Sequence, residues 1–365
     1  MLKYKMKVKK IIKTHFKKLI QSLFFLIYGK VKIQNLDLEK IKITKVKKVD
    51  GINVKKYNYQ FLELKKGRVF TDYIENLSII SKNTLVKNFS FQQINGSLNL
   101  IKNQTLISGT PRFKKKIAGT TLVLTQGASG HFNYAHWLFD IVPKLIMCSQ
   151  VYDLKKIDFF YFSKLNSFQR ETLKLLGIKP NKFIDANVYR HIQCEKLLSV
   201  THPNYFKKTI LFAHSNLPKW ILYVLKKKLL KKNFKKFYYE KIFIDRSDSI
   251  NNHCKIINNE EVIEFLKEKN YRILQLSKIK FIDQISIFKN CKKIIAPHGA
   301  GLANLVFCRR KINVVEIIPK NIKNKVYQRI SKINKLNHKF IYLQNINKNQ
   351  SGDMYLDLRR LHKFL

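Results

Sequence analysis

Two stretches of the sequence combine residue types and spacings that could carry chemistry: one could bind a phosphate, and the other could supply a general base or bind sugar hydroxyls. In the first, Lys292–Cys308, a buried strand at 294–296 leads into the turn Pro297–Gly301 and then into a helix from Leu302. Glycines two positions apart let the backbone approach a ligand closely, and a helix N-terminus presents free N–H groups and a positive dipole end. The local pattern therefore predicts a phosphate at this turn.

Charged residues at two neighbouring strand ends fit the same ligand. Arg246 follows the predicted strand at 241–245, and Glu316 lies near the end of the strand at 313–318. Ligands of parallel sheets bind at the carboxyl ends of the strands, where an arginine can neutralise a diphosphate and a carboxylate can hold ribose hydroxyls. Lys255 could add a second charge. Taken alone, Arg246 and Lys255 are equally well explained as surface charges.

The second stretch is Gly130–Asp140, at the start of a helix predicted over 136–148. Asn133, His136 and Asp140 are spaced i, i+3 and i+7, which places them on one side of the helix. A histidine and an aspartate within two turns can hold a general base or grip sugar hydroxyls. The alternative is a capped helix with a polar exposed stripe.

The elements that position these residues alternate regularly between strand and helix. Strands are expected at 121–125, 157–162, 183–185, 196–200, 241–245, 271–276, 293–296, 313–318 and 340–343, and helices at 136–148, 168–176, 220–232, 259–269, 282–290, 302–307 and 326–336. Such alternation predicts parallel sheets covered on both faces. The charged segment at 231–240 indicates a boundary between two domains. The sequence therefore predicts an acceptor-side lobe at 31–235, which begins with a β-rich extension, and a nucleotide-binding lobe at 236–365.

Composition limits the classes of partner. The formal charge of +49 comes almost entirely from lysine spread along the whole chain, and arginine, which nucleic-acid readers favour, is sparse. Nucleic-acid binding is therefore not expected. The five cysteines form no CxxC pair and show no zinc-ligand spacing, so free thiols in a reducing cytoplasm are expected.

The N-terminus has a different character from the rest of the chain. Residues 7–28 place apolar side chains at helical spacing, with lysines between them, and the apolar run at 19–28 is far shorter than the roughly 20 residues that span a bilayer. We expect residues 1–30 to form a basic amphipathic helix on the anionic inner face of the cytoplasmic membrane. The alternative is a helix that packs on the protein itself.

The order of these motifs resembles glycosyltransferase family 61. The resemblance covers about Leu122 to Pro319 and rests on the strings NYAHWLFDIVPKL, IDRSDS, INNEE, DQISIF, APHGAGLANLVF and VVEIIP. It implies a GT-B fold, with two Rossmann-like lobes facing a cleft. It also implies inverting sugar transfer from a nucleotide-sugar donor to a glycan or glycolipid, in bacteria often during capsule or lipopolysaccharide assembly.

Residue by residue, the resemblance implies a role for each part of the two stretches. Arg246 and the turn from His298 through Gly299 and Ala300 to Gly301, with Asn304 and Lys255, would contact the donor, and Glu316 would hold its ribose. Asp140 is the expected base, with His136 as second candidate, and Asn133 and Trp137 are expected on the acceptor side. Many relatives carry arginine near position 255, so Lys255 is the weaker phosphate ligand.

No DxD-type acidic pair is apparent in the sequence, so metal-independent transfer without a cofactor is expected. Two alternatives stay open at this stage. One is another GT-B-like transferase that moves a pyruvyl or phosphoryl group on polysaccharide. The other is a basic protein without activity that binds anionic lipid or nucleic acid.

Overall fold

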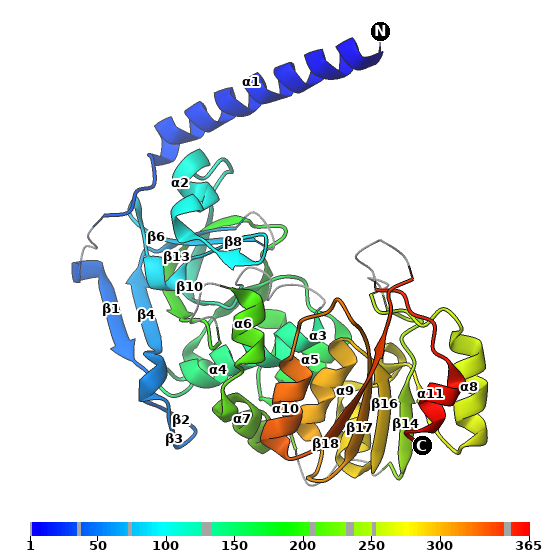
Figure 1. Ribbon diagram of the computed structural model, residues 1–365. Coiled ribbons are helices and arrows are strands. Elements are labelled where there is room, and N and C mark those ends of the chain that lie inside the picture. The colour runs from blue at the N-terminus through cyan, green and yellow to red at the C-terminus, as the bar shows by residue number, and fades with distance from the viewer. Residues whose placement is uncertain are drawn as a thin grey trace. The chain divides into compact units, whose positions relative to one another are not determined.

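The computed structural model describes residues 2–34, 38–71, 75–125, 133–204, 209–230, 237–249, 253–346 and 352–365. It shows a mixed α/β protein whose chain divides into two compact units (Figure 1). Unit 1 comprises Met1–His131, Lys144–Lys164 and Asn181–Ile210, and unit 2 comprises Phe132–Pro143, Leu165–Pro180 and Leu211–Leu365. The helix that carries His136 and Asp140 thus begins in unit 2, together with Arg246 and the glycine turn.

Among its described residues, unit 1 builds one sheet of eleven strands. Its main path runs β12-β11-β10-β13-β5-β6-β8-β9, with β4 also paired to β13, β1 to β4 and β7 to β6. The strands are β1 (Ile41–Lys45), β4 (Gln60–Lys65), β5 (Arg68–Phe70), β6 (Asn76–Ser81), β7 (Thr84–Leu85), β8 (Phe91–Ile94), β9 (Ser97–Leu98), β10 (Lys115–Val123), β11 (Phe159–Phe162), β12 (Phe183–Asp185) and β13 (His191–Val200). A separate hairpin joins β2 (Lys48–Val49) and β3 (Ile52–Asn53).

The two halves of this sheet differ in strand direction. β10, β11, β12 and β13 pair in parallel, as the strand–helix alternation predicts. The β-rich N-terminal region is confirmed, and its strands pair antiparallel to one another and to β13. Buried apolar residues from both halves, including Leu64, Val123 and Leu197, share one core, so the extension is part of the same sheet.

Short helices connect these strands. They are η1 (Leu38–Lys40), η2 (Lys55–Tyr57), η3 (Lys87–Phe89), η4 (Leu100–Lys102), α2 (Gln104–Ser108), α4 (Val142–Cys148), η7 (Leu154–Lys156) and η8 (Pro180–Lys182). All five cysteines of the chain are buried free thiols, in agreement with the absence of paired cysteine motifs.

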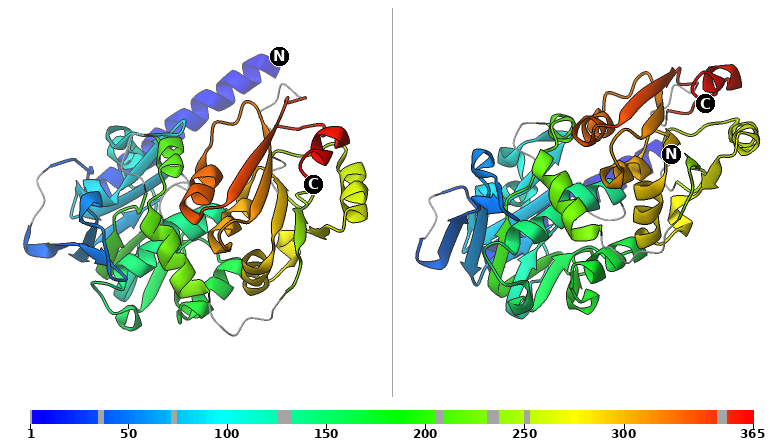
Figure 2. Two further views of the ribbon diagram at one scale, coloured as in Figure 1. Left: turned by 60° about the horizontal axis from the view of Figure 1, so that its bottom comes forward. Right: turned by 90° about the horizontal axis from the view of Figure 1, so that it is seen from below.

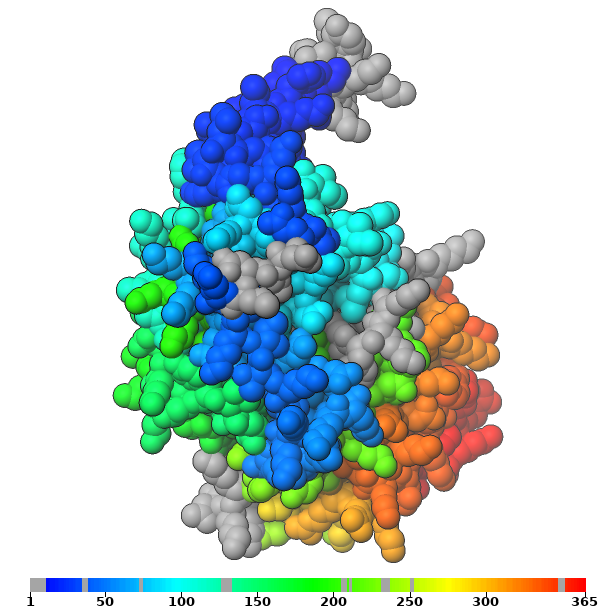
Figure 3. Space-filling model, turned by 90° about the vertical axis from the view of Figure 1, so that its left-hand side faces the viewer, coloured from blue at the N-terminus to red at the C-terminus, as the bar shows by residue number. Residues whose placement is uncertain are grey.

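The N-terminal residues form one helix, α1 (Leu2–Tyr28), whose side chains from Ile11 to Leu19 are exposed (Figure 3). Its last turns contact the rest of unit 1: Phe24 packs edge-on against Phe113, and the Tyr28 hydroxyl accepts a hydrogen bond from the Lys114 N–H. In the part of the chain that the structure describes, no helix combines the length and the apolar character needed to cross a membrane.

Unit 2 contains a five-stranded parallel sheet in the order β15-β14-β16-β17-β18 (Figures 1 and 2). These strands are β14 (Lys241–Ile244), β15 (Arg272–Leu274), β16 (Lys293–Pro297), β17 (Asn313–Pro319) and β18 (Asn337–Leu343). Apolar side chains such as Val315 and Ile317 fill a core against α8 (Asn259–Glu268) and α11 (Leu358–His362) on one face. Fully buried strands of this kind read as continuous apolar runs, which is why the sequence predicts them well.

The helices of unit 2 complete the expected alternation. They are α3 (Tyr134–His136), η6 (Trp137–Ile141), α5 (Ser167–Leu175), α6 (Ile210–Ser215), α7 (Lys219–Leu229), α8 (Asn259–Glu268), η9 (Leu276–Lys278), α9 (Phe281–Asn290), η10 (Ala300–Phe307), α10 (Val326–Asn334) and α11 (Leu358–His362). Each strand and helix expected between residues 121 and 343 is present, with several ends displaced. The helix after the glycine turn starts two residues early, at Ala300, and is a 3₁₀-helix.

A buried histidine joins α1 to the sheet of unit 1. The His191 ring lies edge-on to Tyr28 and to Phe70, its Nδ1 is 2.8 Å from the Arg112 carbonyl oxygen, and the residue is 1% exposed. Burial lowers the pKa of His191 to about 4. Protonation would place a charge in an apolar environment, so this contact needs a neutral ring.

We therefore expect unit 1 to lose stability in mild acid. The pKa of His191 is about 4 in the folded chain and about 6.5 in the unfolded chain. Between pH 6.5 and pH 4 the unfolded chain therefore binds more protons than the folded chain, and the free energy of unfolding decreases as the pH falls. Replacing His191 by Phe should reduce the acid-induced drop in the free energy of unfolding by about 2–3 kcal/mol. Urea unfolding at pH 6.5, 5.5 and 4.5 measures this, and an unchanged pH slope in the variant would contradict it.

Candidate active site

The strand order of unit 2 indicates where a ligand would bind. β14 lies between β15 and β16, so the chain leaves β14 toward one side of the sheet and continues from β16 toward the other. In open parallel sheets of this order, ligands bind at the carboxyl ends of the two strands where the direction reverses. Arg246 follows β14, and His298 and Gly299 follow β16, so the predicted phosphate residues meet at this point.

Arg246 lies directly on the glycine turn. Its Nη1 donates a short hydrogen bond to the His298 carbonyl oxygen, and its Nη2 donates to Ser249 Oγ at 3.1 Å. A Cβ added to Gly299 would overlap the guanidinium. With Arg246 in this position, Gly299 has no room for a side chain, and the guanidinium lies against the backbone of the turn.

A buried aspartate shapes the loop that carries Arg246. Asp245 accepts hydrogen bonds from Ser247 Oγ at 2.8 Å, Gln275 Nε2 at 2.8 Å and Asn259 Nδ2 at 3.0 Å. Burial opposes its ionisation, but these bonds outweigh the burial and hold the pKa of Asp245 below its usual range. The carboxylate is therefore charged at neutral pH and fixes the first residues after β14.

Glu316 lies within β17 and is 2% exposed. His298 Nδ1 donates a short hydrogen bond to Oε1, and His338 Nε2 lies 3.0 Å from Oε2. Burial opposes ionisation of Glu316, yet the two histidines hold the pKa of Glu316 below its usual range. Both carboxylate oxygens face histidine rings, so the ribose contact expected for Glu316 stays a prediction that this geometry does not support.

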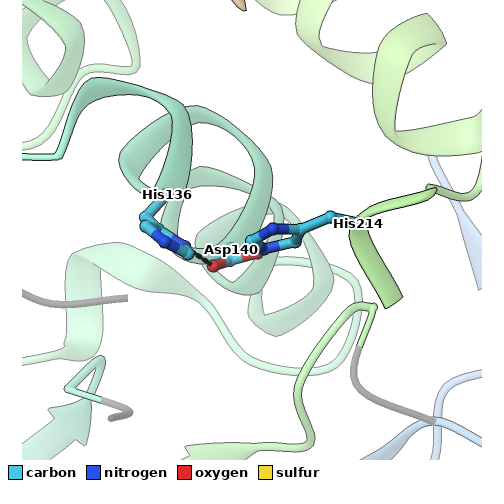
Figure 4. A group of neighbouring side chains, drawn as sticks. All are labelled: His136, Asp140 and His214. Carbon is cyan, nitrogen blue, oxygen red and sulfur yellow. Dashed lines mark hydrogen bonds and ion pairs between the residues drawn. The ribbon is translucent and has the colours of Figure 1, made fainter. Parts of the chain in front are cut away.

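His136 and Asp140 come together one turn apart, where the helix widens into the π-helical segment η6 (Figure 4). His136 Nδ1 and Asp140 Oδ2 are 2.6 Å apart. Asp140 is fully buried, whereas the His136 side chain is 15% exposed. His214, from α6, lies beside them with its ring centroid 4.9 Å from that of His136. Burial, followed by the nearby His136, lowers the pKa of His214 to about 4.

One ligand atom from each of His136, Asp140 and His214 lies within 4.8 Å of the others, close enough to surround a metal ion. Two ligands of one tetrahedral zinc would be about 3.3 Å apart, given zinc–nitrogen distances of about 2.0–2.1 Å. The 2.6 Å separation of His136 and Asp140 is instead that of a charge-assisted hydrogen bond. The geometry favours a histidine oriented by a carboxylate, and metal-independent transfer stays a prediction.

A buried chain of hydrogen bonds joins this helix to the glycine turn. The Tyr134 hydroxyl donates to Asn304 Oδ1 at 2.5 Å, and Asn304 Nδ2 donates to Gln284 Oε1 at 3.0 Å and to the Gly301 carbonyl at 3.2 Å. Gln284 in turn donates to the Leu276 carbonyl at 2.8 Å. Asn304 is fully buried, so it holds the helix of His136 against η10, and the donor contact expected for it stays untested.

The remaining predicted residues occupy varied positions. Asn133 is the exposed N-cap of α3, and its side chain accepts a hydrogen bond from the His136 N–H. Trp137 is fully buried, a position that suits packing more than acceptor contact. Lys255 is exposed, and Ala300 is half-buried in the first turn of η10. An added Cβ at Gly301 would lie 2.8 Å from Leu276 Cδ1, so this glycine permits close packing.

Three residues of the site were not predicted. His214 and His338 are distant in sequence from the carboxylates they face, and Tyr134 is 170 positions from Asn304. The sequence offers only weak signals for them. His214 lies beside apolar residues in the string FAHS, and the strand–helix alternation places His338 next to a predicted strand. Spacing along the chain cannot show contacts between separate elements.

Comparison with known proteins identifies the family. Residues 134–315, which include the His136–Asp140 pair, Arg246, the glycine turn and the start of β17, match the family model described as Glycosyltransferase 61. No curated protein matches the chain. The match agrees with the motif order and with the residues that meet in unit 2. The chain belongs to glycosyltransferase family 61 and is a glycosyltransferase.

Proposed function

We propose that the protein is an inverting transferase that moves a sugar from a nucleotide-sugar donor to a glycan or lipid-linked glycan during capsule or lipopolysaccharide assembly. The observation that carries the proposal is the presence, in one compact unit, of a carboxylate-oriented histidine and of an arginine that lies on a glycine turn. The first supplies a base for an acceptor hydroxyl, and the second a site for a departing diphosphate. A GT-B arrangement of the two units remains part of this proposal.

His136 is the better candidate for the base. Asp140 is fully buried and its Oδ2 faces His136 Nδ1, so the carboxylate orients the ring and leaves Nε2 for the acceptor. This reverses the order expected from the sequence, in which Asp140 came first. In the reaction, Nε2 takes the hydroxyl proton as the acceptor oxygen attacks the anomeric carbon from the face opposite the nucleotide, which inverts its configuration.

Arg246 and the first turn of η10 act on the leaving group. The bond from the anomeric carbon to the phosphate oxygen breaks, and its electron pair leaves with the nucleoside diphosphate. The guanidinium and the N–H groups at the start of η10 face this developing charge without having to reorganise. Arg246 is already fixed by His298 and Ser249, so the site is prepared before the donor arrives.

A donor screen tests the function. UDP-, GDP-, CDP- and dTDP-sugars and the free diphosphates are compared by thermal shift and by release of nucleoside diphosphate. Stabilisation by one nucleoside diphosphate and hydrolysis of its sugar conjugate are expected. If none of these nucleotides stabilises the protein, a pyruvyl or phosphoryl transferase, or a binding protein without activity, becomes the better reading.

Substitutions in the histidine–carboxylate pair should lower transfer while leaving donor binding intact. His136→Ala is expected to reduce turnover about 10²–10⁴-fold, since it removes general-base catalysis. Asp140→Asn should reduce turnover through loss of ring orientation, with the Michaelis constant for the donor nearly unchanged. Turnover is measured at saturating donor beside the exposed His362→Gln control. If Asp140→Asn raises only the Michaelis constant for the acceptor and leaves turnover unchanged, the pair serves acceptor binding instead of catalysis.

Loss of the guanidinium should affect the leaving group. Arg246→Ala is expected to lower turnover on the order of 100-fold with the fold retained. Arg246→Lys should recover only part of this, because an ammonium keeps the charge but not the planar fork that bridges His298 and Ser249. Steady-state kinetics and circular dichroism are compared with the exposed Arg310→Ala variant. Near-normal turnover of Arg246→Ala would refute this role.

The proposal also places the enzyme on the cytoplasmic face of an anionic membrane through α1. Ile12, Phe16, Leu19 and Leu23 follow one another at intervals of three or four and are 51–70% exposed, so they form an uncovered apolar stripe. Exposed lysines, among them Lys13 and Lys17, lie off this stripe. This combination suits a helix that lies in the headgroup region, where lipid-linked acceptors would be reached.

Liposome flotation tests the membrane contact. The full chain should float with vesicles containing phosphatidylglycerol and much less with phosphatidylcholine alone. Leu19→Gln with Leu23→Gln should abolish flotation, and Lys13→Gln should weaken it about fivefold, since each lysine near the surface contributes about 1 kcal/mol. The exposed Ile101→Gln, elsewhere in unit 1, serves as control. Equal flotation of the double variant, or of a chain lacking residues 1–30, would exclude this surface.

A further inference from the structure

The contacts of Glu316 raise a question of charge. A buried carboxylate without a charged partner is strongly unfavourable, and Glu316 is ionised at neutral pH, as the low pKa of Glu316 shows. Among the described residues, the groups that form ion pairs with it are His298 and His338. Asp245 is held by neutral amide and hydroxyl donors, whereas both oxygens of Glu316 face imidazole rings, either of which can carry the balancing proton.

The other groups near this cluster do not supply that charge. Burial raises the pKa of the Tyr327 hydroxyl and raises that of the Cys254 thiol to about 11, so both are neutral. Arg246 is a cation, but its guanidinium bonds to the His298 carbonyl and to Ser249 and not to the carboxylate. The titratable or charged groups around His298 are therefore Glu316 on β17, His338 on β18, Tyr327 on α10, Arg246 after β14 and Cys254 in the loop before α8.

The two histidines differ in what their rings face. His338, on β18, has a buried side chain that is 5% exposed and stacks on Phe340 with ring centroids 4.4 Å apart. His298 is 11% exposed, packs against Tyr327 and belongs to the glycine turn. Its Nδ1 is committed to Glu316, which leaves Nε2 as the nitrogen available to a ligand at the turn.

We propose that Glu316 and His338 are positioning residues for the leaving diphosphate: they hold His298 as an oriented cation whose Nε2–H is donated to a phosphate oxygen. This inference rests on the proposed function and deepens it, because it gives Glu316 a role other than ribose binding. The anion site then has two cationic donors, Arg246 and His298. His298, Glu316 and His338 together form a clasp, and loss of any one of its side chains lowers the affinity for a diphosphate.

A binding cycle with inorganic pyrophosphate and UDP tests this without any acceptor. Calorimetry gives the dissociation constant of the wild type, Glu316→Gln, His298→Gln and the double variant between pH 6 and 8.5. Each single variant is expected to bind at least tenfold more weakly at pH 6.5, and the double variant no more weakly than His298→Gln. Such non-additivity is the signature of a residue that acts through another. At each pH the dissociation constant of a variant is divided by that of the wild type, so that the effect of ligand protonation cancels.

Two further variants keep the test decisive. His338→Asn retains a donor toward Glu316 and should keep most of the affinity, whereas His338→Phe should not. If thermal unfolding shows that Glu316→Gln does not fold, the dissociation constants of His338→Asn, His338→Phe and His298→Gln are compared instead. The exposed His362→Gln should bind as the wild type does.

The outcomes separate this inference from the proposed function. Wild-type binding of UDP or pyrophosphate, together with unchanged binding by Glu316→Gln and His338→Phe, would overturn the clasp alone. Additive losses in the double variant would also overturn it, since Glu316 would then contact the ligand independently. Absence of binding by the wild type to pyrophosphate and to UDP, GDP, CDP and ADP would overturn both proposals.

Discussion

Burial of negative charge is the constraint on which the site of unit 2 depends. Asp140, Asp245 and Glu316 are each at most 4% exposed, and a carboxylate removed from water needs compensating donors. Each is compensated differently: Asp140 by His136, Asp245 by neutral donors such as Gln275, and Glu316 by two histidines. Two of the compensating groups, His136 and His298, are also side chains that we propose to contact substrate. The burial of these carboxylates therefore also determines how the proposed site residues are oriented.

The same logic explains why the glycine turn is shaped as it is. A phosphate-binding turn commonly uses glycine so that the ligand can approach the backbone. Here the first group that approaches Gly299 is the guanidinium of Arg246, and the second glycine, Gly301, makes room for Leu276. The turn therefore packs against an arginine from the loop that follows β14, which places a positive charge beside the turn.

The Tyr134–Asn304 hydrogen bond joins the two chemical halves of the site. It connects the first turn of the helix carrying His136 to η10, and Gln284 extends the connection to the loop before α9. Buried polar networks of this kind allow few alternative arrangements when each member is satisfied. Interior contacts thus set the separation between the proposed base and the proposed anion site.

The sequence alone determined the alternating elements, the glycine turn and the family, because these depend on local patterns: apolar runs of strand length, caps such as Asn133, and motif order. It also placed His136 and Asp140 on one side of a helix. Tertiary structure decided what each residue does there. His214, His338 and Tyr134 face partners that are distant in sequence. The Asp140 side chain is fully buried and that of His136 is partly exposed, which makes His136 the better candidate for the base. Contacts between separate elements and exclusion from water arise only when the sheet and its helices pack, so spacing along the chain does not encode them.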